Sequence, residues 1–322
     1  MNQLLFYQNI VGLDRVKHAQ LNLVTPNNFE FAKSTNIIPI LVSELDEVIS
    51  EFPVVFIPSG KSEFILAAIA DLRKDNNLFV KNGVWQGRYI PAFVRRYPFI
   101  TIGKPEDAGQ FMIGIDEAAS CFKTDVKKLA ANQEAHLLFD GEKPGKMLNS
   151  LIPFLQQFHV DNLNTIAFCK KVAALGLITA SNIKTKGKDG SEYQLQGVGL
   201  IDEAKLKTLD QETIYDLFKT GVLPQIYRQQ FSLRNCGVLA EKLALGKASP
   251  PQVSPAPPVK QPSLPAATSK DAAPVTLKAP VAKPAAKVAT PSKAAAKPVT
   301  KAAAKVVKKP APKAAVKSSK KR

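Results

Sequence analysis

The chain changes character abruptly near Lys247–Ala248, and this change limits what each side of it can fold into. Every Phe, Tyr and Trp of the 322 residues lies before residue 248. A segment without aromatic side chains, and rich in Ala, Lys and Pro, cannot bury enough apolar surface to offset the entropy lost when its backbone is ordered. The sequence therefore predicts a globular domain over residues 1–247 and a disordered tail over residues 248–322.

Charge divides at the same position. Residues 1–247 hold 28 of the 44 Lys and Arg and 26 of the 27 Asp and Glu, which gives a formal net charge of +2. Residues 248–322 hold 16 basic side chains against the carboxylate of Asp271, which gives +15. The overall charge of +17 is therefore a property of the tail, and it does not indicate a basic domain.

The domain shows no signal for export, membrane insertion or disulfide bonding. Cys121, Cys169 and Cys236 are far apart and match no redox or zinc spacing, so we interpret them as buried apolar residues in a reducing compartment. The N-terminus has no basic segment followed by an apolar run, and no stretch approaches about 18 apolar residues. We expect a cytoplasmic protein without a transmembrane span, which would reach the cell surface only by a signal-independent route.

The first half of the domain has short apolar runs separated by turn residues, a pattern typical of antiparallel strands. Strands are predicted over residues 19–24, 36–42, 53–58, 64–72, 77–80, 97–102 and 110–115. Over residues 62–72 a helix is the competing prediction, because the alanines there favour one. A short helix over residues 43–52, capped by Ser43, is also predicted.

The second half has apolar residues at helical spacing. It predicts helices over residues 144–158, 161–175, 202–206, 210–220 and 223–243, and a strand over residues 193–201. Pro153 should kink or restart the first of these helices, and Gly176 should end the second. Together the two halves predict an α+β fold: a mainly antiparallel N-terminal sheet with C-terminal helices packed on it, followed by the disordered tail.

A series of short, different motifs runs along almost the whole domain. They are Pro53-Val-Val-Phe, Asn77-Leu-Phe-Val, Asn82-Gly-Val-Trp85, Tyr89-Ile-Pro-Ala, Arg95-Arg96-Tyr97-Pro98-Phe99, Ile115-Asp116-Glu117, Leu138-Phe139-Asp140-Gly141, Ile201-Asp202-Glu203 and the run Gly221–Ser232. In these motifs the domain resembles the SapC family of bacterial proteins over nearly all of residues 1–245. The resemblance implies a link to bacterial surface layers, and it carries over no catalytic residues. Family members have also been named as peptide-transport components, which conflicts with a chain that has no predicted membrane span.

Aromatic and basic side chains gather in one short stretch and are the candidate ligand-binding residues. Together with an acidic residue that follows a later strand, they are Trp85, Tyr89, Arg95, Arg96, Tyr97 and Asp116. A strand over residues 93–97 would send Arg95 and Arg96 to opposite faces. One guanidinium could then bind a carboxylate or phosphate beside an aromatic ring that stacks on the ligand.

The alternative is a structural role for the same residues. Trp85 and Tyr97 would lie in the core, and one Arg would pair with Asp116 or Glu117. Arg96→Ala would then destabilise the fold without weakening any ligand. Asp116 and Glu117 would point to opposite faces of a strand and make a poor carboxylate pair. If a helix begins at Glu117, Asp116 is its N-cap.

No motif in the domain indicates a metal or a reaction. His18, His136 and His159 share no metal-ligand spacing. The sequence has neither a glycine-rich phosphate loop nor a nucleophile elbow. We therefore expect no metal, no cofactor and no catalytic residue.

The tail repeats lysines at short spacings and resembles the tails of linker histones and of histone-like bacterial proteins. Its predicted polyanion-binding residues are Lys283, Lys287, Lys293, Lys297, Lys301, Lys305, Lys308, Lys309, Lys313, Lys317, Lys320, Lys321 and Arg322. Such a chain suits sequence-independent phosphate binding by counterion release, and its lack of aromatics argues against base stacking. The alternatives are an anionic membrane surface, an acidic polysaccharide, or a passive tail that only improves solubility.

The leading hypothesis is a non-enzymatic protein with an accessory or binding role. The resemblance adds a link to surface-layer biology, and the tail adds binding to nucleic acid or another polyanion. The main alternative is an enzyme, or the partner of one, that acts on a small molecule or peptide in a pocket near Trp85, Tyr89, Arg96 and Asp116. A third hypothesis, a self-assembling surface protein, requires an export route. The sequence names no protein partner.

Overall fold

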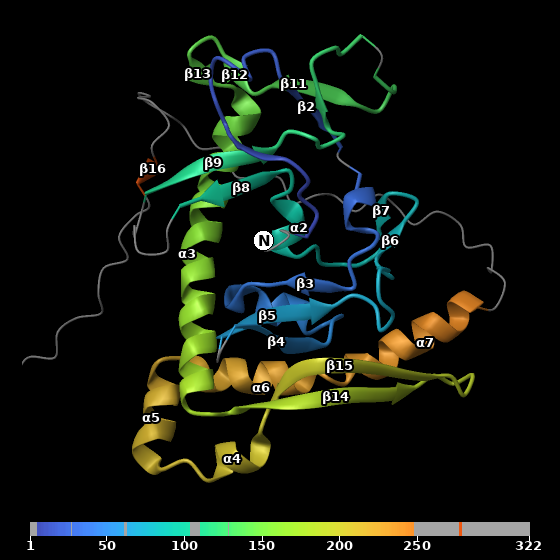
Figure 1. The fold of residues 1–322 in the computed structure, drawn as a ribbon, viewed down its shortest axis with the longest axis vertical. Coiled ribbons are helices and arrows are strands. Elements are labelled where there is room, and N and C mark those ends of the chain that lie inside the picture. The colour runs from blue at the N-terminus through green and yellow to red at the C-terminus, as the bar shows by residue number, and fades with distance from the viewer. Residues whose placement is uncertain are drawn as a thin grey trace, which may run out of the picture. The chain divides into compact units, whose positions relative to one another are not determined.

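The computed structural model describes residues 5–26, 28–60, 63–103, 110–127, 129–247 and 277–278. The predicted tail lies outside the described residues except for residues 277–278, so its disorder and the domain boundary at residue 247 stay predictions. Within the described part, antiparallel sheets and a series of helices confirm the predicted α+β fold (Figure 1).

The main sheet has five antiparallel strands in the order β14-β15-β4-β5-β3. They are β3 (Ile37–Pro39), β4 (Val54–Gly60), β5 (Glu63–Ile69), β14 (Ile178–Lys186) and β15 (Glu192–Ile201). The predicted strand over residues 53–58 is confirmed as β4. The competing helix over residues 62–72 is wrong, because most of that segment forms β5. Residues 66–69 of β5 are all buried, so both faces of the strand are covered.

The hairpin β14–β15 brings the second half of the chain into this sheet. The strand β15 is predicted, but β14 is not, because its side chains are mostly polar and only half-buried or exposed. Gly199 of β15 pairs with Phe56 of β4. A Cβ at Gly199 would lie 3.2 Å from the Phe56 Cβ and 2.6 Å from Ile178 Cγ2, so glycine permits the close approach of the neighbouring strands.

A second sheet is built on the strand β9 (Gln110–Asp116). Its partners, all antiparallel, are β1 (Ile10–Gly12), β8 (Phe99–Ile102) and β16 (Leu277–Lys278). The predicted pairing of the two strands near residues 97–102 and 110–115 is confirmed, with Phe99 opposite Ile115. Both of these side chains are buried, which fixes the register of the sheet.

Short strands complete the described sheets. They are β2 (Asn22–Thr25) with β10 (Phe122–Lys123) and β11 (Glu134–Leu137), β12 (Phe139–Asp140) with β13 (Lys143–Pro144), and β6 (Val80–Lys81) with β7 (Val84–Trp85). The predicted turn between β6 and β7 is confirmed, because Asn82 and Gly83 have φ angles of 51° and 73°. Two successive positive φ angles are typical of a tight hairpin turn.

One long helix, α3 (Lys146–Ala174), runs beside both large sheets (Figure 1). The prediction of two helices is wrong, because the 29-residue helix continues through Pro153. Pro153 is exposed and removes one backbone hydrogen bond, while Leu148 and Leu155 on either side are buried. The helix ends as predicted at Gly176, which has a φ of 62° and donates its N–H to the Ala173 carbonyl.

The remaining helices are short. They are η1 (Glu30–Ala32), η2 (Val42–Glu44), α1 (Leu45–Val48), α2 (Ala92–Arg95), α4 (Glu203–Lys207), α5 (Gln211–Lys219), α6 (Val222–Ser232) and α7 (Asn235–Lys247). Asp202 and Asp210 cap α4 and α5 with their carboxylates. Ser43 does not cap the first helical segment as predicted, because its hydroxyl donates to Asp161. The predicted helix over residues 223–243 is two helices, α6 and α7.

Two hydrophobic clusters form the core, and α3 contributes to both. The larger cluster surrounds the five-stranded sheet and includes Phe158 and Phe168 of α3. The smaller cluster lies around β8 and β9 and includes Leu148 and Leu155. The three cysteines are buried and free, as predicted. In the part of the chain that the structure describes, no helix is both long enough and apolar enough to cross a membrane.

The continuous path of α3 predicts that Pro153→Ala stabilises the protein. Alanine restores the missing backbone hydrogen bond at an exposed position. We expect the free energy of unfolding to rise by about 2 kcal/mol. A proline inside a helix destabilises the folded state by about 3 kcal/mol, but it also restricts the unfolded chain, which stabilises the protein by about 1 kcal/mol. Urea unfolding of the full chain measures this. Pro144→Ala, outside the helix, is the control, and a gain no larger than that of the control would contradict a continuous helix.

Candidate functional site

The two adjacent arginines of the candidate site lie at the end of α2 and point in different directions. The predicted strand over residues 93–97 is wrong: Pro91 precedes a single helical turn, and Arg96 is its C-cap. One residue of helix turns the side chain by about 100°, so the two arginines still diverge. The Arg95 side chain is 36% exposed, whereas Arg96 is only 6% exposed.

Aromatic rings enclose the Arg96 guanidinium. Its Cζ lies 4.3 Å from the ring centroid of Phe93, 4.5 Å from that of Phe158 and 5.7 Å from that of Tyr7. Rings attract a cation through their electron-rich faces. The guanidinium has five N–H donors and interacts with the Tyr7 hydroxyl, so it keeps donors for a further hydrogen-bonded partner.

The charge of Arg96 has no carboxylate partner among the described residues. The predicted ion pair with Asp116 or Glu117 does not form, and the buried Nε atom has no hydrogen-bond acceptor. Burial lowers the pKa of Arg96, and its interaction with the Tyr7 hydroxyl partly offsets that effect. An arginine nevertheless stays protonated in proteins. The domain therefore holds a desolvated cation, an arrangement that normally requires a paired anion.

Arg96 lines a cavity with a volume of about 720 Å³. This volume lies within the range of about 300–1,000 Å³ that is common for ligand sites. The walls come from β3, the β4–β5 hairpin, α2, β8 and α3. They are mostly apolar and consist of Leu5, Pro39, Ile40, Leu41, Pro58, Ser59, Phe64, Ile65, Leu66, Phe93, Arg96, Ile100, Thr101, Phe158, Asn162, Thr165, Ile166 and Cys169. Arg96 is the cation of this lining.

Arg95 belongs to a different cluster, centred on the buried carboxylate of Glu44. Glu44 accepts hydrogen bonds from the Tyr89 hydroxyl at 2.6 Å and from the N–H groups of Ala92 and Leu41 at 2.6 and 2.8 Å. Arg95 lies 4.0 Å from Glu44 and donates to the Tyr89 oxygen at 3.2 Å. Burial raises the pKa of Glu44, while the three hydrogen bonds oppose this rise. The cluster fixes α2 to the segment before α1.

Trp85 lies in the core, as the structural alternative predicts. Its indole Nε1 donates to the Tyr89 carbonyl at 2.9 Å, and its ring packs against Phe29, Phe52 and Phe79. The side chain is 7% exposed and satisfied, so it offers no free surface for stacking on a ligand.

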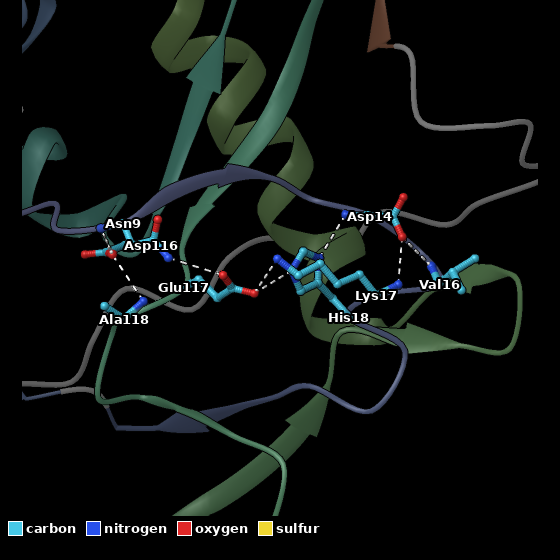
Figure 2. A network of polar contacts seen from close by, with 8 residues as sticks. All are labelled: Asn9, Asp14, Val16, Lys17, His18, Asp116, Glu117 and Ala118. Carbon is cyan, nitrogen blue, oxygen red and sulfur yellow. Dashed lines mark hydrogen bonds and ion pairs between the residues drawn. The ribbon is translucent and has the colours of Figure 1, made fainter.

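Asp116 is a buried hydrogen-bond acceptor that ties the N-terminal segment to the end of β9 (Figure 2). Its carboxylate accepts from the N–H groups of Gln8 and Asn9 at 3.0 and 2.8 Å and from the Tyr97 hydroxyl at 3.1 Å. No helix begins at residue 117, so the predicted N-cap is wrong. Asp116 instead accepts from the N–H of Ala118 in a turn. Tyr97 and Asp116 thus contact each other, and both contact the N-terminal segment.

A second part of this network surrounds His18 (Figure 2). The Asp14 N–H donates to His18 Nδ1 at 2.9 Å, so the neutral ring carries its proton on Nε2, which lies 3.5 Å from a Glu117 oxygen. Lys17 reaches the same Glu117 oxygen at 2.8 Å. Glu117 is therefore paired with Lys17 and His18 rather than with an arginine.

The six candidate residues do not converge on one cavity. Arg96 lines the cavity, Tyr89 and Arg95 surround Glu44, Tyr97 and Asp116 hold the N-terminal segment, and Trp85 lies in the core. The sequence analysis missed Glu44, Phe93 and Phe158. Phe93 is close to the arginines in the chain, but no local pattern links Glu44 or Phe158 to them. The candidate residues of the tail, from Lys283 to Arg322, lie outside the described residues.

The described residues contain no cluster of His, Cys, Asp or Glu that could hold a metal ion. The cysteine of the cavity, Cys169, is 2% exposed, and burial raises the pKa of its thiol to about 12. At neutral pH this thiol is protonated and is a weak nucleophile. The site is therefore apolar, with one charge supplied by Arg96.

Fold and site together define an α+β protein with an apolar cavity and an unpaired arginine in its wall. Comparison with protein families matches residues 13–239 to the SapC family model. The match covers more than half of the chain, and the chain belongs to the SapC family. No curated protein and no solved structure matches it.

The contacts of Asp116 predict a structural role. Asp116→Ala leaves three backbone N–H groups and a hydroxyl without their acceptor, and we expect it to lower the free energy of unfolding by about 3 kcal/mol. Glu117→Ala is the matched control and should cost about 1 kcal/mol or less, because that side chain is partly exposed. Urea unfolding of both variants at neutral pH measures the difference. Equal losses in the two variants would contradict this role.

Proposed function

We propose that this SapC family protein acts by binding, and that its domain holds a small ligand whose anionic group pairs with Arg96. One observation carries the proposal: Arg96 is 6% exposed, lines the cavity and has no carboxylate partner among the described residues. Desolvating a cation is costly, and a partner anion offsets the cost. A bound ligand can supply that anion.

The competing explanation is that Arg96 only supports the fold through Phe93, Phe158 and Tyr7. Contacts with aromatic rings contribute about 2 kcal/mol when the cation is desolvated. The two explanations differ in what they predict for an apolar substitute. Replacing an unpaired buried charge by an apolar side chain of similar size is often neutral or stabilising. Removing a ligand's ion partner weakens binding whatever happens to stability.

We therefore predict that Arg96→Met keeps the full chain folded, with a free energy of unfolding equal to or above that of the wild type. The same substitution should weaken the binding of an apolar anion at least about tenfold. A lost charge-assisted hydrogen-bonded pair is worth about 1.5–3 kcal/mol, which corresponds to about tenfold or more. The probe is 1-anilinonaphthalene-8-sulfonate, followed by its fluorescence in titrations of the full chain.

Arg95→Met is the matched control, because Arg95 neighbours Arg96 but lies outside the cavity lining. Its affinity for the probe should equal that of the wild type. Arg96→Lys should bind with intermediate affinity, since it keeps the charge and loses the planar fork. Equal affinity of the wild type and Arg96→Met would overturn the proposal.

A second binding function belongs to the tail, and its support comes from the charge of residues 248–322. We propose that the tail holds the protein on nucleic acid through its 16 basic side chains. The domain is nearly neutral, so it would add little to this attraction. The accessory role and the link to surface layers remain proposals that the SapC membership motivates.

The tail proposal predicts that the full chain binds double-stranded DNA and that the affinity falls by about 10³-fold or more between 50 and 200 mM salt, if at least about six phosphates are contacted. A chain ending at Lys247 should not bind. Fluorescence anisotropy of a labelled duplex measures both. Equal binding by the two chains would place the interaction in the domain, and no binding by either would remove nucleic acid as the partner. Vesicles of anionic lipid and an acidic polysaccharide are the comparison ligands.

A further inference from the structure

The cavity follows one face of α3 over three turns. Phe158, Asn162, Thr165, Ile166 and Cys169 line it, and their spacings place them on a single stripe of the helix. The last lies eleven positions after the first, which corresponds to a length of about 16 Å. The space is therefore elongated along the helix axis.

Charge is concentrated at one end of this stripe. The Arg96 Cζ lies 4.5 Å from the ring centroid of Phe158, where the stripe begins. At the other end, Cys169 and Leu66 are buried, and the Cys169 thiol is close to the Leu66 backbone. An occupant thus meets a cation at the Phe158 end and apolar groups at the Cys169 end.

The polar groups of α3 between the two ends give a ligand little to bind. Thr165 has a hydroxyl that donates to the Asp161 carbonyl at 2.7 Å and accepts from the Val42 N–H at 2.8 Å, so its hydrogen bonds are used within the protein. Asn162 is exposed and lies at the rim. Opposite α3, the lining residues of β5 are apolar: Phe64, Ile65 and Leu66. The middle of the cavity is therefore suited to an apolar body.

One cation among the described lining residues also limits the charge of the ligand. A phosphate monoester would bring close to two negative charges and leave one of them desolvated and unpaired. A carboxylate carries one charge, and its two oxygens match the fork of the guanidinium. A neutral ligand would leave Arg96 unpaired.

We infer that the ligand is an elongated apolar monocarboxylate, whose head group binds Arg96 and whose chain lies along α3 toward Cys169. This inference rests on the proposed function of the cavity and specifies its ligand class. The alkyl chain of the ligand would be covered by α3 on one side and by the β4–β5 hairpin and β3 on the other. Apolar burial would supply most of the affinity, and Arg96 would set the orientation.

The test is a calorimetric titration of the full chain with straight-chain carboxylates from hexanoate to tetradecanoate, each below its micelle concentration. Each added methylene should tighten binding about three- to fourfold until the chain exceeds the stripe, after which the gain should stop. The alcohol of the same length should bind at least about tenfold more weakly than the carboxylate. In Arg96→Met this difference between carboxylate and alcohol should disappear.

A variant at the far end tests the orientation. Ile166 is half-buried and lines the cavity about 12 Å along the helix from Phe158. Ile166→Trp should lower the affinity for dodecanoate at least about tenfold. It should change the affinity for hexanoate less than about twofold, because the shorter alkyl chain does not reach residue 166. Ile166→Leu keeps the volume and is the control. A circular dichroism spectrum like that of the wild type confirms that both variants are folded.

The outcomes separate the ligand class from the proposed function. If the sulfonate probe depends on Arg96 but the carboxylates show no dependence on chain length, the ligand class is wrong and the anion site remains. If the carboxylate and the alcohol of one length bind equally in the wild type, or keep their difference in Arg96→Met, the head group does not bind Arg96, and the inferred orientation is overturned. If Ile166→Trp weakens the binding of hexanoate and of dodecanoate equally, the alkyl chain does not lie along α3.

Discussion

The architecture depends on the packing of α3 against two separate hydrophobic clusters. Leu148 and Leu155 bury themselves beside β8 and β9, and Phe158 and Phe168 do so beside the five-stranded sheet. This helix runs for 29 residues without a break and so reaches both sheets. The cavity is lined by residues of β3, β8, α2 and this helix. In Figure 1, α2 lies between β8 and β3. The space for a ligand is therefore a consequence of how α3 bridges the clusters.

Polar contacts fix the segments around this frame and leave Arg96 as the exception. Glu44 and Asp116 are both buried carboxylates, and each is surrounded by donors from backbone and tyrosine side chains. Arg96 is buried to a similar degree, yet the described residues give it aromatic rings in place of a counter-charge. Natural domains rarely keep such a cost without a use for it, because an apolar side chain would fit among the same rings. This contrast is the physical basis for a binding role.

Several parts of the fold and the site could be predicted from the sequence, and the failures have identifiable causes. Apolar runs bounded by prolines located β4, and turn chemistry located the hairpin at Asn82 and Gly83. The prediction at Pro153 was wrong because the local preference of proline indicates a break, while packing on both sides keeps the helix continuous. The strand β14 was missed because its polar side chains give no strong alternation, although pairing with β15 stabilises it. Among the candidate residues, Arg96 was chosen for its chemistry, but its partners Phe93 and Phe158 come from separate elements.

The sequence by itself determined the abrupt change near residue 247, the concentration of positive charge beyond it, and the alternation of strand and helix patterns that defines the α+β class. These properties depend on composition and on short-range spacing, which are readable along the chain. Only the tertiary structure decided which charged groups are paired. Arg95 and Arg96 are neighbours with identical side chains, yet one meets Glu44 near the surface and the other faces an apolar cavity. The reason is physical: burial and ion pairing depend on residues far apart in the chain, and one helical turn at α2 sends the two arginines to different environments.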